Sequence, residues 1–322
     1  MRPSDFPAVI AKTGRSPLGR AALRRAAVGA ASAAIVAALV SVALFRLHTR
    51  TVRAQQQPAP AVRPAHVSGF TQPDPIDFND HTGWTRIFDG QSLKDWDGSP
   101  EVWHVEDGAI VGESSPEHPS GTTNIIWRGG QPANFELKLE MKLEGSGANG
   151  GIQYRSLNVP STLPGPLSPA QLAQMTDAQR QRMQQRRAQA AKFAKWNMKG
   201  YQADFDYANV YTGQLYEQGT GRGIIAWRGQ MVQTDPGRPH RLLATLGSSD
   251  ELKSYIKVGD WNQYEVIADG NTLIHIINGR VMAILVDNDP AFLQSKGYIG
   301  FEIEGGGVVR VLQKDIWLKP LP

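Results

Sequence analysis

Residues 135–144 read Phe-Glu-Leu-Lys-Leu-Glu-Met-Lys-Leu-Glu, and this stretch decides the fold class. Five apolar side chains alternate with five charged ones, so the apolar set shares one face of an extended strand. A period of two is typical of an antiparallel strand with one buried face and one solvated face. The stretch therefore predicts a sheet that packs one side on a hydrophobic core.

Shorter strand-like runs recur through the rest of the chain. They occupy residues 151–155, 201–206, 264–268, 273–277, 281–286, 298–304 and 308–312. Turn sequences separate them, including Asp269-Gly270-Asn271 and Asn278-Gly279, which favour tight hairpins. Many short strands at this spacing predict an all-β sandwich or barrel.

One segment, residues 168–196, departs from the strand pattern. It begins with Ser168-Pro169, which is typical of a helix N-cap followed by the first helical residue. Ala, Gln and Arg dominate the remainder, so we expect a helical insertion (167–197) on the sheet scaffold. It is expected to be either a solvated decoration or a lid or edge of the substrate cleft.

The charge of the chain is unevenly distributed. The formal net charge is +4, but nine basic residues and one acidic residue precede Gln55, which leaves −4 for the remainder. This mildly acidic remainder argues against nucleic-acid binding. The chain has no cysteine, which excludes disulfides, zinc ribbons, iron–sulfur clusters and cysteine nucleophiles.

An uncharged apolar run covers residues 26–45 and follows Arg20, Arg24 and Arg25. A helix of about 20 such residues is long enough to cross the hydrocarbon core of a bilayer. We expect a signal or transmembrane segment in residues 1–54, a Pro-rich linker in 55–82 and the globular domain in 83–322. The protein is then exported, either periplasmic or anchored to the membrane with the domain outside the cytoplasm.

The Gly-x-Gly-x-x-Gly match at residues 145–150 does not indicate a dinucleotide site. Such a site needs a helix directly after the glycines, whose N-terminus binds the pyrophosphate. A strand-like run follows here instead, so we read the glycines as a hairpin and expect no nucleotide cofactor.

Two of the strands carry acids at alternate positions, which places the acids on one face. In residues 201–206, Ala203 and Phe205 lie on the face opposite to the acids. In residues 298–304, Phe301 and its apolar neighbours lie on the face opposite to the acids. The expected polar face comprises Gln153, Arg155, Gln202, Asp204, Asp206, Glu302 and Glu304. Carboxylates and amides suit sugar hydroxyls, and aromatic side chains such as Trp127 and Trp227 can stack on a sugar ring. Paired carboxylates in a cleft would also have separated pKa values, giving one acid and one base.

A series of motifs in order along residues 83–322 resembles the 3-keto-disaccharide hydrolase domain family. The matching residues are Gly83 to Gly90 with Leu93 and Trp96, Trp103 to Ile110, Asn134 to Leu137, Gly147 to Arg155, Gly200 to Asp204, Leu215 to Glu217, Trp261 to Tyr264, Asn278-Gly279 and Gly297 to Glu302. The resemblance implies a concanavalin A-like jelly-roll sandwich of two antiparallel sheets. It also implies cleavage of the glycosidic bond of 3-keto-glycosides (3-keto-disaccharides), in which a carboxylate removes a proton next to the ketone.

Positions matching the family motifs supply the expected site. Glu113 and Asp204 are expected as catalytic carboxylates, one of them the base, with Arg155 orienting the keto group. Substrate-binding residues are expected at Asn149, Gln153, Gln202, Glu217 and Glu302. The chain departs from the family at Gly150, where many relatives have Ser, and at Glu302 and Glu304, where Gln and His are common.

Two other functions remain open from the sequence. The domain is alternatively a non-catalytic carbohydrate-binding module on the same fold, because jelly rolls host lectins as readily as hydrolases. It is otherwise a surface interaction or scaffold protein whose helical insertion carries the partner site. The expected partners are a small-molecule sugar and, through the N-terminal segment, a membrane. No cofactor is expected; the many carboxylates leave a bound divalent cation open, but no ligand spacing establishes one.

Overall fold

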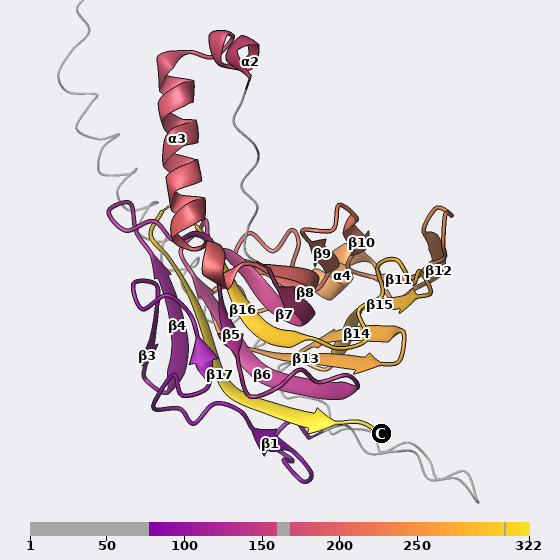
Figure 1. The fold of residues 1–322 in the computed structure, drawn as a ribbon. Coiled ribbons are helices and arrows are strands. Elements are labelled where there is room, and N and C mark those ends of the chain that lie inside the picture. Colours follow the sequence, from indigo (N-terminus) through magenta and orange to yellow (C-terminus); the bar gives the residue numbers. More distant parts are fainter. Residues whose placement is uncertain (1–76, 160–167, 306) are drawn as a thin grey trace, which may run out of the picture. The chain divides into compact units, whose positions relative to one another are not determined.

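The structure, a computed structural model, describes residues 77–159, 168–305 and 307–322. These residues fold into a sandwich of two β-sheets with a helical insertion, which confirms the predicted all-β jelly-roll class (Figure 1). The predicted signal or transmembrane segment lies outside the described residues. Among the helices in the described part, none is both long and apolar enough to span a bilayer.

The larger sheet has ten strands, and β6 lies in its interior. In spatial order the strands are β12 (Arg241–Thr245), β11 (Gln230–Thr234), β15 (Arg280–Asp287), β14 (Thr272–Ile277), β13 (Asn262–Asp269), β6 (Phe135–Glu144), β17 (Val309–Pro320), β4 (Ala109–Ser114) and β3 (Trp103–Glu106), with β1 (Thr85–Arg86) paired to β17. Neighbouring strands are antiparallel except for β11 and β15, which run parallel. The predicted meander is β13, β14 and β15.

The smaller sheet has seven strands, all antiparallel to their neighbours. In spatial order they are β10 (Gly223–Ala226), β9 (Leu215–Gln218), β8 (Met198–Asp206), β7 (Asn149–Asn158), β16 (Tyr298–Gly305), β5 (Gly121–Trp127) and β2 (Trp96–Asp97). Strand β16, from near the C-terminus, lies between β7 and β5.

The core lies between the two sheets. The five apolar side chains of β6 are at most 2% exposed, and they share one cluster with Tyr154, Tyr201 and Phe301 of the smaller sheet. Full burial of one such side chain contributes about 1.5–3 kcal/mol. The charged side chains of β6 lie on the outer face, where Glu136 and Glu140 pair with lysines of β17.

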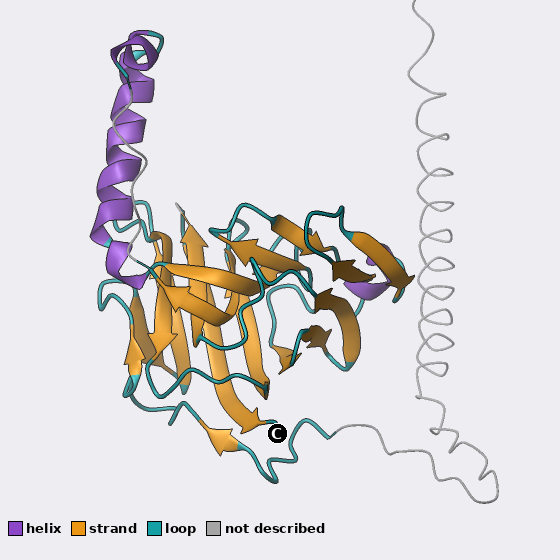
Figure 2. Ribbon diagram, turned by 45° about the vertical axis from the view of Figure 1, so that its right-hand side comes forward, coloured by secondary structure: helices purple, strands orange, loops and turns teal. Residues whose placement is uncertain are grey.

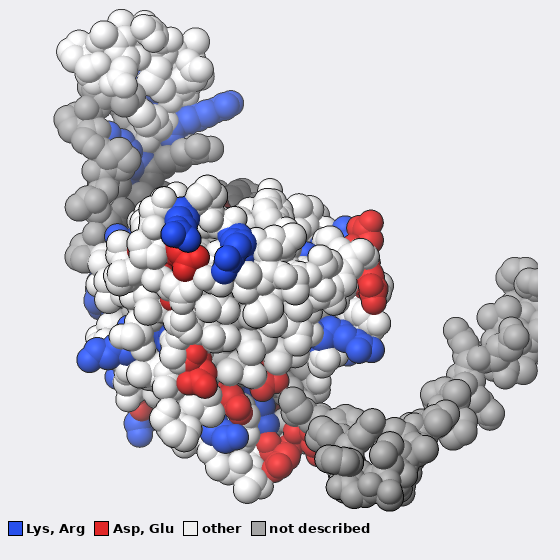
Figure 3. Space-filling view, turned by 90° about the vertical axis from the view of Figure 1, so that its right-hand side faces the viewer, with Lys and Arg blue, Asp and Glu red and all other residues white. Residues whose placement is uncertain are grey.

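Acidic and basic side chains are interspersed on the outer surface. Figure 3 shows both signs on the face it presents, separated by wide uncharged areas.

The insertion between β7 and β8 is helical, as predicted. It contains α2 (Pro169–Ala173), α3 (Asp177–Lys192) and the short 3-10 helix η1 (Ala194–Trp196); a further helix, α4 (Ser249–Lys253), lies elsewhere in the chain. Ser168 caps α2 and forms a capping box with Gln171. Helix α3 projects away from the sandwich (Figures 1 and 2), and none of its described side chains is buried.

Candidate active site

Acidic residues from β8 and β16 lie on either side of β7 on the outer face of the smaller sheet. Gly151 of β7 is the register partner of both Asp204 in β8 and Glu302 in β16. The two acids are therefore two strand spacings apart along the sheet, about 10 Å between their backbones. The alternation of side chains in β8 and β16 is confirmed, because Ala203, Phe205 and Phe301 face the core.

Gly151 has no side chain, and the space that this leaves allows side chains of β8 and β16 to contact each other across β7. A Cβ at this position would lie 2.7 Å from the Ala203 carbonyl oxygen and 2.9 Å from the Gln202 Nε2. Without that atom, the Gln202 amide reaches across β7 and donates a hydrogen bond to Glu302 Oε2. Gln153 Nε2 donates to the same oxygen over 3.4 Å.

Further amides bind the other carboxylates. Gln214 Nε2 donates to Asp204 Oδ2 over 2.5 Å, and Asn149 Nδ2 donates to Glu304 Oε2 over 2.9 Å. Tyr216 of β9 is the register partner of Gln202. We call these residues the polar cluster: Asn149, Gln153, Gln202, Asp204, Gln214, Tyr216, Glu302 and Glu304.

Burial changes the ionisation of the cluster. It raises the pKa of Glu302 to about 7, and the negative charge of Glu304 adds to this rise. Burial also raises the pKa of Asp204 well above its usual range, opposed by the Gln214 hydrogen bond and reinforced by the Glu302 charge. The pKa of Tyr216 is raised, first by burial and then by Asp204, Glu302 and Glu304, so its hydroxyl stays protonated. Two buried carboxyl groups with raised pKa values can serve as acid and base near neutral pH.

The polar cluster is closed at one end and open at the other. Gln202 is 4% exposed and Glu302 is 3% exposed, whereas Asn149 is half-buried and Glu304 is exposed. Since Asn149 is the register partner of Glu304, the open end lies at this pair, and Asp206, the partner of Asn149 in β8, is buried beside it.

The base of the insertion covers the closed end. Asn124 of β5 is the register partner of Glu302, and its Nδ2 donates to the Trp196 carbonyl in η1 over 3.0 Å. The Met198 Sδ packs 2.5 Å from the position that a Cβ of Gly300 would take. Strand β5 is contacted by η1 and also by α3, while the rest of α3 projects away from the sandwich (Figure 1).

The placement of Glu113 in the same cleft is wrong. Glu113 lies in β4 of the larger sheet, on its outer face, and its side chain is 52% exposed. Its charged neighbour is Arg310 of β17, whose Nε lies 4.0 Å from Glu113 Oε2. Strand alternation places a side chain inside or outside, but it does not say to which sheet the strand belongs.

The placement of Arg155 on the polar face is also wrong. Its backbone has φ +44° at a register shift of β7, and this bulge interrupts the alternation. The fully buried guanidinium donates to the Ala133 carbonyl (2.7 Å), the Gly270 carbonyl (2.7 Å) and Asn134 Oδ1 (3.1 Å). Arg155 therefore joins loops of the larger sheet to β7 and does not face the carboxylates.

Glu217 is likewise separated from the polar cluster, because it shares the inward face of β9 with Leu215. It is 1% exposed and accepts hydrogen bonds from Arg222, which also donates to Asp287 Oδ2 over 2.7 Å. Tyr201 donates to Asp287 as well, over 2.6 Å. Glu217 belongs to this internal network between the sheets.

The structure brings together the five remaining predicted residues, namely Asn149, Gln153, Gln202, Asp204 and Glu302. Asp206 of the expected polar face instead stabilises the following turn, where its carboxylate accepts the amides of Val210, Tyr211 and Thr212. Sequence reasoning missed Gln214 and Tyr216. The alternation in β9 indicates an outward Tyr216, but no sequence pattern indicates the Gln214 contact, because Gln214 precedes the strand.

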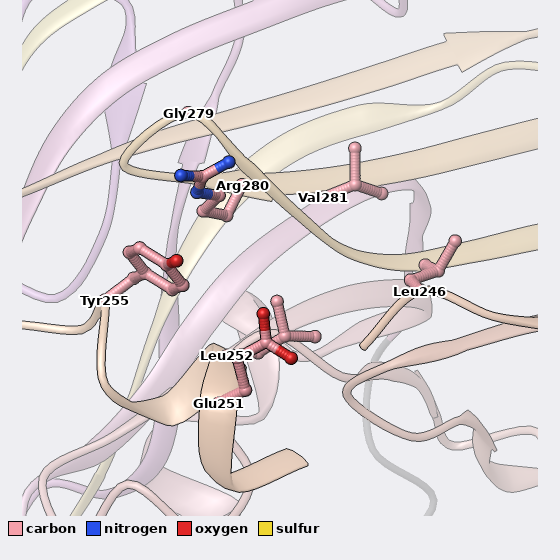
Figure 4. A pocket seen from close by; sticks show the side chains of 7 residues that line it. All are labelled: Leu246, Glu251, Leu252, Tyr255, Gly279, Arg280 and Val281. Carbon is pink, nitrogen blue, oxygen red and sulfur yellow. The ribbon is translucent and has the colours of Figure 1, made fainter. Parts of the chain in front are cut away.

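A separate pocket of about 380 Å³ has no residue of the polar cluster in its lining (Figure 4). Its lining residues are Leu246, Glu251, Leu252, Tyr255, Gly279, Arg280 and Val281. Glu251 is the only carboxylate among these lining residues, so the pocket lacks the paired acids that distinguish the polar cluster. Among the described residues, no group of three or more His, Cys, Asp or Glu side chains is arranged to hold a metal ion.

A family described as the 3-keto-alpha-glucoside-1,2-lyase-like domain matches residues 83–319. No curated protein is significantly similar to the chain.

Similar solved structures share low sequence identity with the chain. A candidate glycosyl hydrolase from Parabacteroides distasonis has 16% identity and a TM-score of 0.42, covering 78% of this chain and 100% of its own. The carbohydrate-binding module CBM66 from Bacillus subtilis has 13% identity and a TM-score of 0.36, covering 74% and 97%. A β-1,3-1,4-glucanase derived from a mouse hindgut metagenome has 10% identity and a TM-score of 0.37, covering 74% and 98%.

Proposed function

The chain belongs to the 3-keto-alpha-glucoside-1,2-lyase-like domain family, and we propose that it cleaves the glycosidic bond of 3-keto-glycosides at the polar cluster. One observation carries this proposal. Asp204 and Glu302 are buried carboxyl groups with raised pKa values, and they flank a glycine on the same sheet face.

The reaction is an elimination followed, in the hydrolytic version, by addition of water. A ketone at C3 acidifies the proton on C2, so a carboxylate can remove it and leave an enolate. The electron pair then forms the C1–C2 double bond as the C1–O bond breaks, and an acid protonates the leaving oxygen. Water adds across the double bond for net hydrolysis, whereas release of the unsaturated sugar completes a lyase reaction.

The surroundings of the two acids suggest their roles. Glu302 accepts two amide hydrogen bonds, which favour its ionised form, and we assign it as the base. The Asp204 side chain accepts one such hydrogen bond, from Gln214, and burial raises its pKa well above the usual range, so we assign it as the acid for the leaving oxygen. The protonated hydroxyl of Tyr216 is a donor for the developing enolate oxygen.

A carbohydrate-binding module without turnover is the second candidate. None of the ion pairs formed within residues 77–159, 168–305 and 307–322 includes Asp204, Glu302 or Glu304. Because the Arg155 guanidinium binds loop carbonyls, only neutral hydrogen-bond donors of the polar cluster are left to stabilise the enolate. Neutral amides and hydroxyls are equally suited to binding a sugar without turnover.

Release of the aglycone from an aryl 3-keto-glucoside tests the proposal. We expect the full chain to release it, and Asp204→Asn and Glu302→Gln each to lower kcat by about 10²–10⁴-fold, the usual contribution of an acid or base. Glu113→Gln is the matched control, a carboxyl-to-amide change on the other sheet, and should retain wild-type activity. Saturable binding without release by the wild type would identify a binding module, and full activity in both cluster variants would refute the assignment.

We also propose that the protein is exported, periplasmic or anchored through residues 1–54. The apolar run at 26–45 and the basic residues before it support this proposal. Fractionation of cells that express the full chain tests it, because a cytoplasmic protein would be recovered in the soluble cell interior.

A further inference from the structure

His275 of β14 is a fully buried side chain in the core between the two sheets. Its ring lies edge-on to Tyr154 of β7 and Tyr264 of β13, with ring centroids 5.6 Å and 6.3 Å away. A buried imidazole has two ring nitrogens that both need hydrogen-bond partners. Both nitrogens of His275 have one, and the proposed mechanism uses neither.

The partners of His275 define where its proton resides. Burial lowers the pKa of His275 to about 4, so the ring is neutral near pH 7 and carries a single N–H. Its Nδ1 lies 3.2 Å from the Gln214 carbonyl oxygen, which can only accept, so the proton resides on Nδ1. The Nε2 then accepts from the Tyr154 hydroxyl over 2.8 Å. His275 is therefore a fixed donor to the backbone of Gln214.

Gln214 connects His275 to Asp204 in two ways. The carbonyl that accepts from His275 also accepts the Asp204 amide over 3.3 Å, and Gln214 Nε2 donates to Asp204 Oδ2 over 2.5 Å. Gln214 lies just before β9, outside the register pairs that join β8 to β9. Its Oε1 is buried and has no hydrogen-bond partner in the described part of the chain. The orientation of the Gln214 amide therefore depends on the Asp204 contact and on the position of its own backbone.

We propose that His275 is a positioning residue that holds Gln214 in place for its hydrogen bond to Asp204. This inference rests on the proposed function for the role of Asp204 as the acid, whereas the contacts themselves do not depend on turnover. Without the Nδ1 donor, the Gln214 carbonyl loses one of its two hydrogen bonds, and the amide is no longer held opposite Asp204. A hydrogen bond to a carboxylate favours its ionised form, so loss of the Gln214 contact raises the pKa of Asp204.

Other titratable groups also act on Asp204, and a test of the proposal has to leave them unchanged. They lie on β8, β9, β13 and β16 and comprise Asp206, Tyr216, Tyr264, Glu302 and Glu304. Neither of the two hydrogen bonds of His275 involves any of them. A folded variant at position 275 therefore keeps these groups in place and changes the Gln214 hydrogen bond.

A pH–rate profile of the full chain on an aryl 3-keto-glucoside tests the proposal. His275→Phe keeps an aromatic ring but lacks the donor, so kcat should fall about tenfold through poorer orientation of Asp204. Ionisation of the acid Asp204 ends activity at high pH, and this falling limb should move up by about one pH unit. His275→Asn should restore the wild-type limb, because its Nδ2 takes the place of Nδ1. Tyr154→Phe is the matched control and should keep that limb, because it removes only the hydrogen bond at Nε2.

These profiles overturn the proposal if the limb is unshifted in His275→Phe, or if it is shifted in either His275→Asn or Tyr154→Phe. Should His275→Phe not fold, His275→Gln replaces it. The Nε2 of this glutamine takes the place of the imidazole Nε2 and leaves Gln214 without its donor.

A titration that needs no turnover separates failure of this inference from failure of the proposed function. If the wild type releases no aglycone, the carbon NMR signal of the Asp204 carboxyl group is followed with pH in the full chain. Its absence in Asp204→Asn assigns the signal. A pKa of Asp204 that is about one unit higher in His275→Phe than in wild type and in Tyr154→Phe supports the positioning role. Equal pKa values in the three proteins overturn it.

Discussion

Glu302 illustrates how one buried side chain receives its chemical properties from its neighbours. Burial among strands raises its pKa to about 7, and the exposed carboxylate of Glu304 on the same strand face adds to the rise. Amide groups of Gln153 and Gln202 act in the opposite direction. The balance places the ionisation of the proposed base close to neutral pH, where a general base is most effective.

The Glu304→Gln change should move the pH dependence of catalysis. Activity needs ionised Glu302, so kcat should rise with pH through about 7 in wild type. Removal of the Glu304 charge lowers the pKa of Glu302, so the rising limb should shift to lower pH. A pH–rate profile measures the shift, with Glu113→Gln as the control; identical limbs in wild type and Glu304→Gln would contradict this account.

The Glu302→Gln change should alter stability in a pH-dependent way. The folded-state pKa of about 7 exceeds the ordinary value of 4.5, so between these pH values the folded protein holds more protons than the unfolded chain. Stability contributed by this proton is present at low pH and is lost as the pH rises toward 7. Glu302→Gln should therefore raise the Tm relative to wild type more at pH 8 than at pH 5. Thermal denaturation at both pH values measures this, and an equal difference at the two values would count against a raised pKa.

At the scale of elements, the bulge in β7 determines which side chains reach the site. Up to Tyr154 the strand alternates regularly, with Gln153 outside and Tyr154 in the core. At Arg155 the backbone takes the left-handed conformation, and the side chain turns toward neighbouring loops. Because of the bulge, Arg155 does not reach the site and instead forms hydrogen bonds that join β7 to neighbouring loops.

Arg155→Met should destabilise the fold without a direct effect on chemistry. The substitution leaves the Ala133 and Gly270 carbonyls without their guanidinium donor, and an unsatisfied buried polar group costs about 1–3 kcal/mol. We expect a loss of at least about 2 kcal/mol in the free energy of unfolding, with kcat retained at temperatures where the variant is folded. Denaturant unfolding measures the loss, and Arg182→Met on the exposed α3 is the control. A variant that is as stable as wild type but inactive would contradict this account and indicate that Arg155 takes part in catalysis.

The alternation of apolar and polar residues within single strands predicted more of the site than matching positions to the family motifs did. It correctly assigned the outer faces of β8 and β16, because each strand carries regular apolar side chains on the opposite face. It could not foresee the bulge at Arg155, which depends on loops distant in sequence. Glu217 was placed by family position although Leu215 two residues earlier indicates an inward face. Glu113 was misplaced because the assignment of β4 to the larger sheet depends on pairing with β17, more than 190 residues later.

At the scale of the whole molecule, the helical insertion divides into a base and a projecting part. The base, η1, contacts Asn124 at the closed end of the polar cluster. Helices α2 and α3 bury no described side chain and extend from the sandwich (Figure 2). This arrangement favours a solvated decoration over a lid for the projecting part.

Replacement of residues 168–192 by a short Gly-Ser linker should therefore leave the proposed activity intact. We expect an unchanged Tm and an unchanged kcat on the aryl 3-keto-glucoside, because η1 and the sheet remain. A second deletion that also removes residues 194–196 is the comparison, and it should lower activity by exposing Asn124. Loss of kcat in the first deletion would show that the projecting helices act as a lid.

The position of β16 also determines when the polar cluster is completed during synthesis of the chain. This strand begins 140 residues after the end of β7, yet it inserts between β7 and β5 and brings Glu302 opposite Gly151. A nascent polypeptide that ends before residue 298 can therefore carry Asp204 but has no partner carboxyl group for it. Under the proposed function, cleavage therefore requires synthesis through β16, and products that end before residue 298 should be inert toward 3-keto-glycosides.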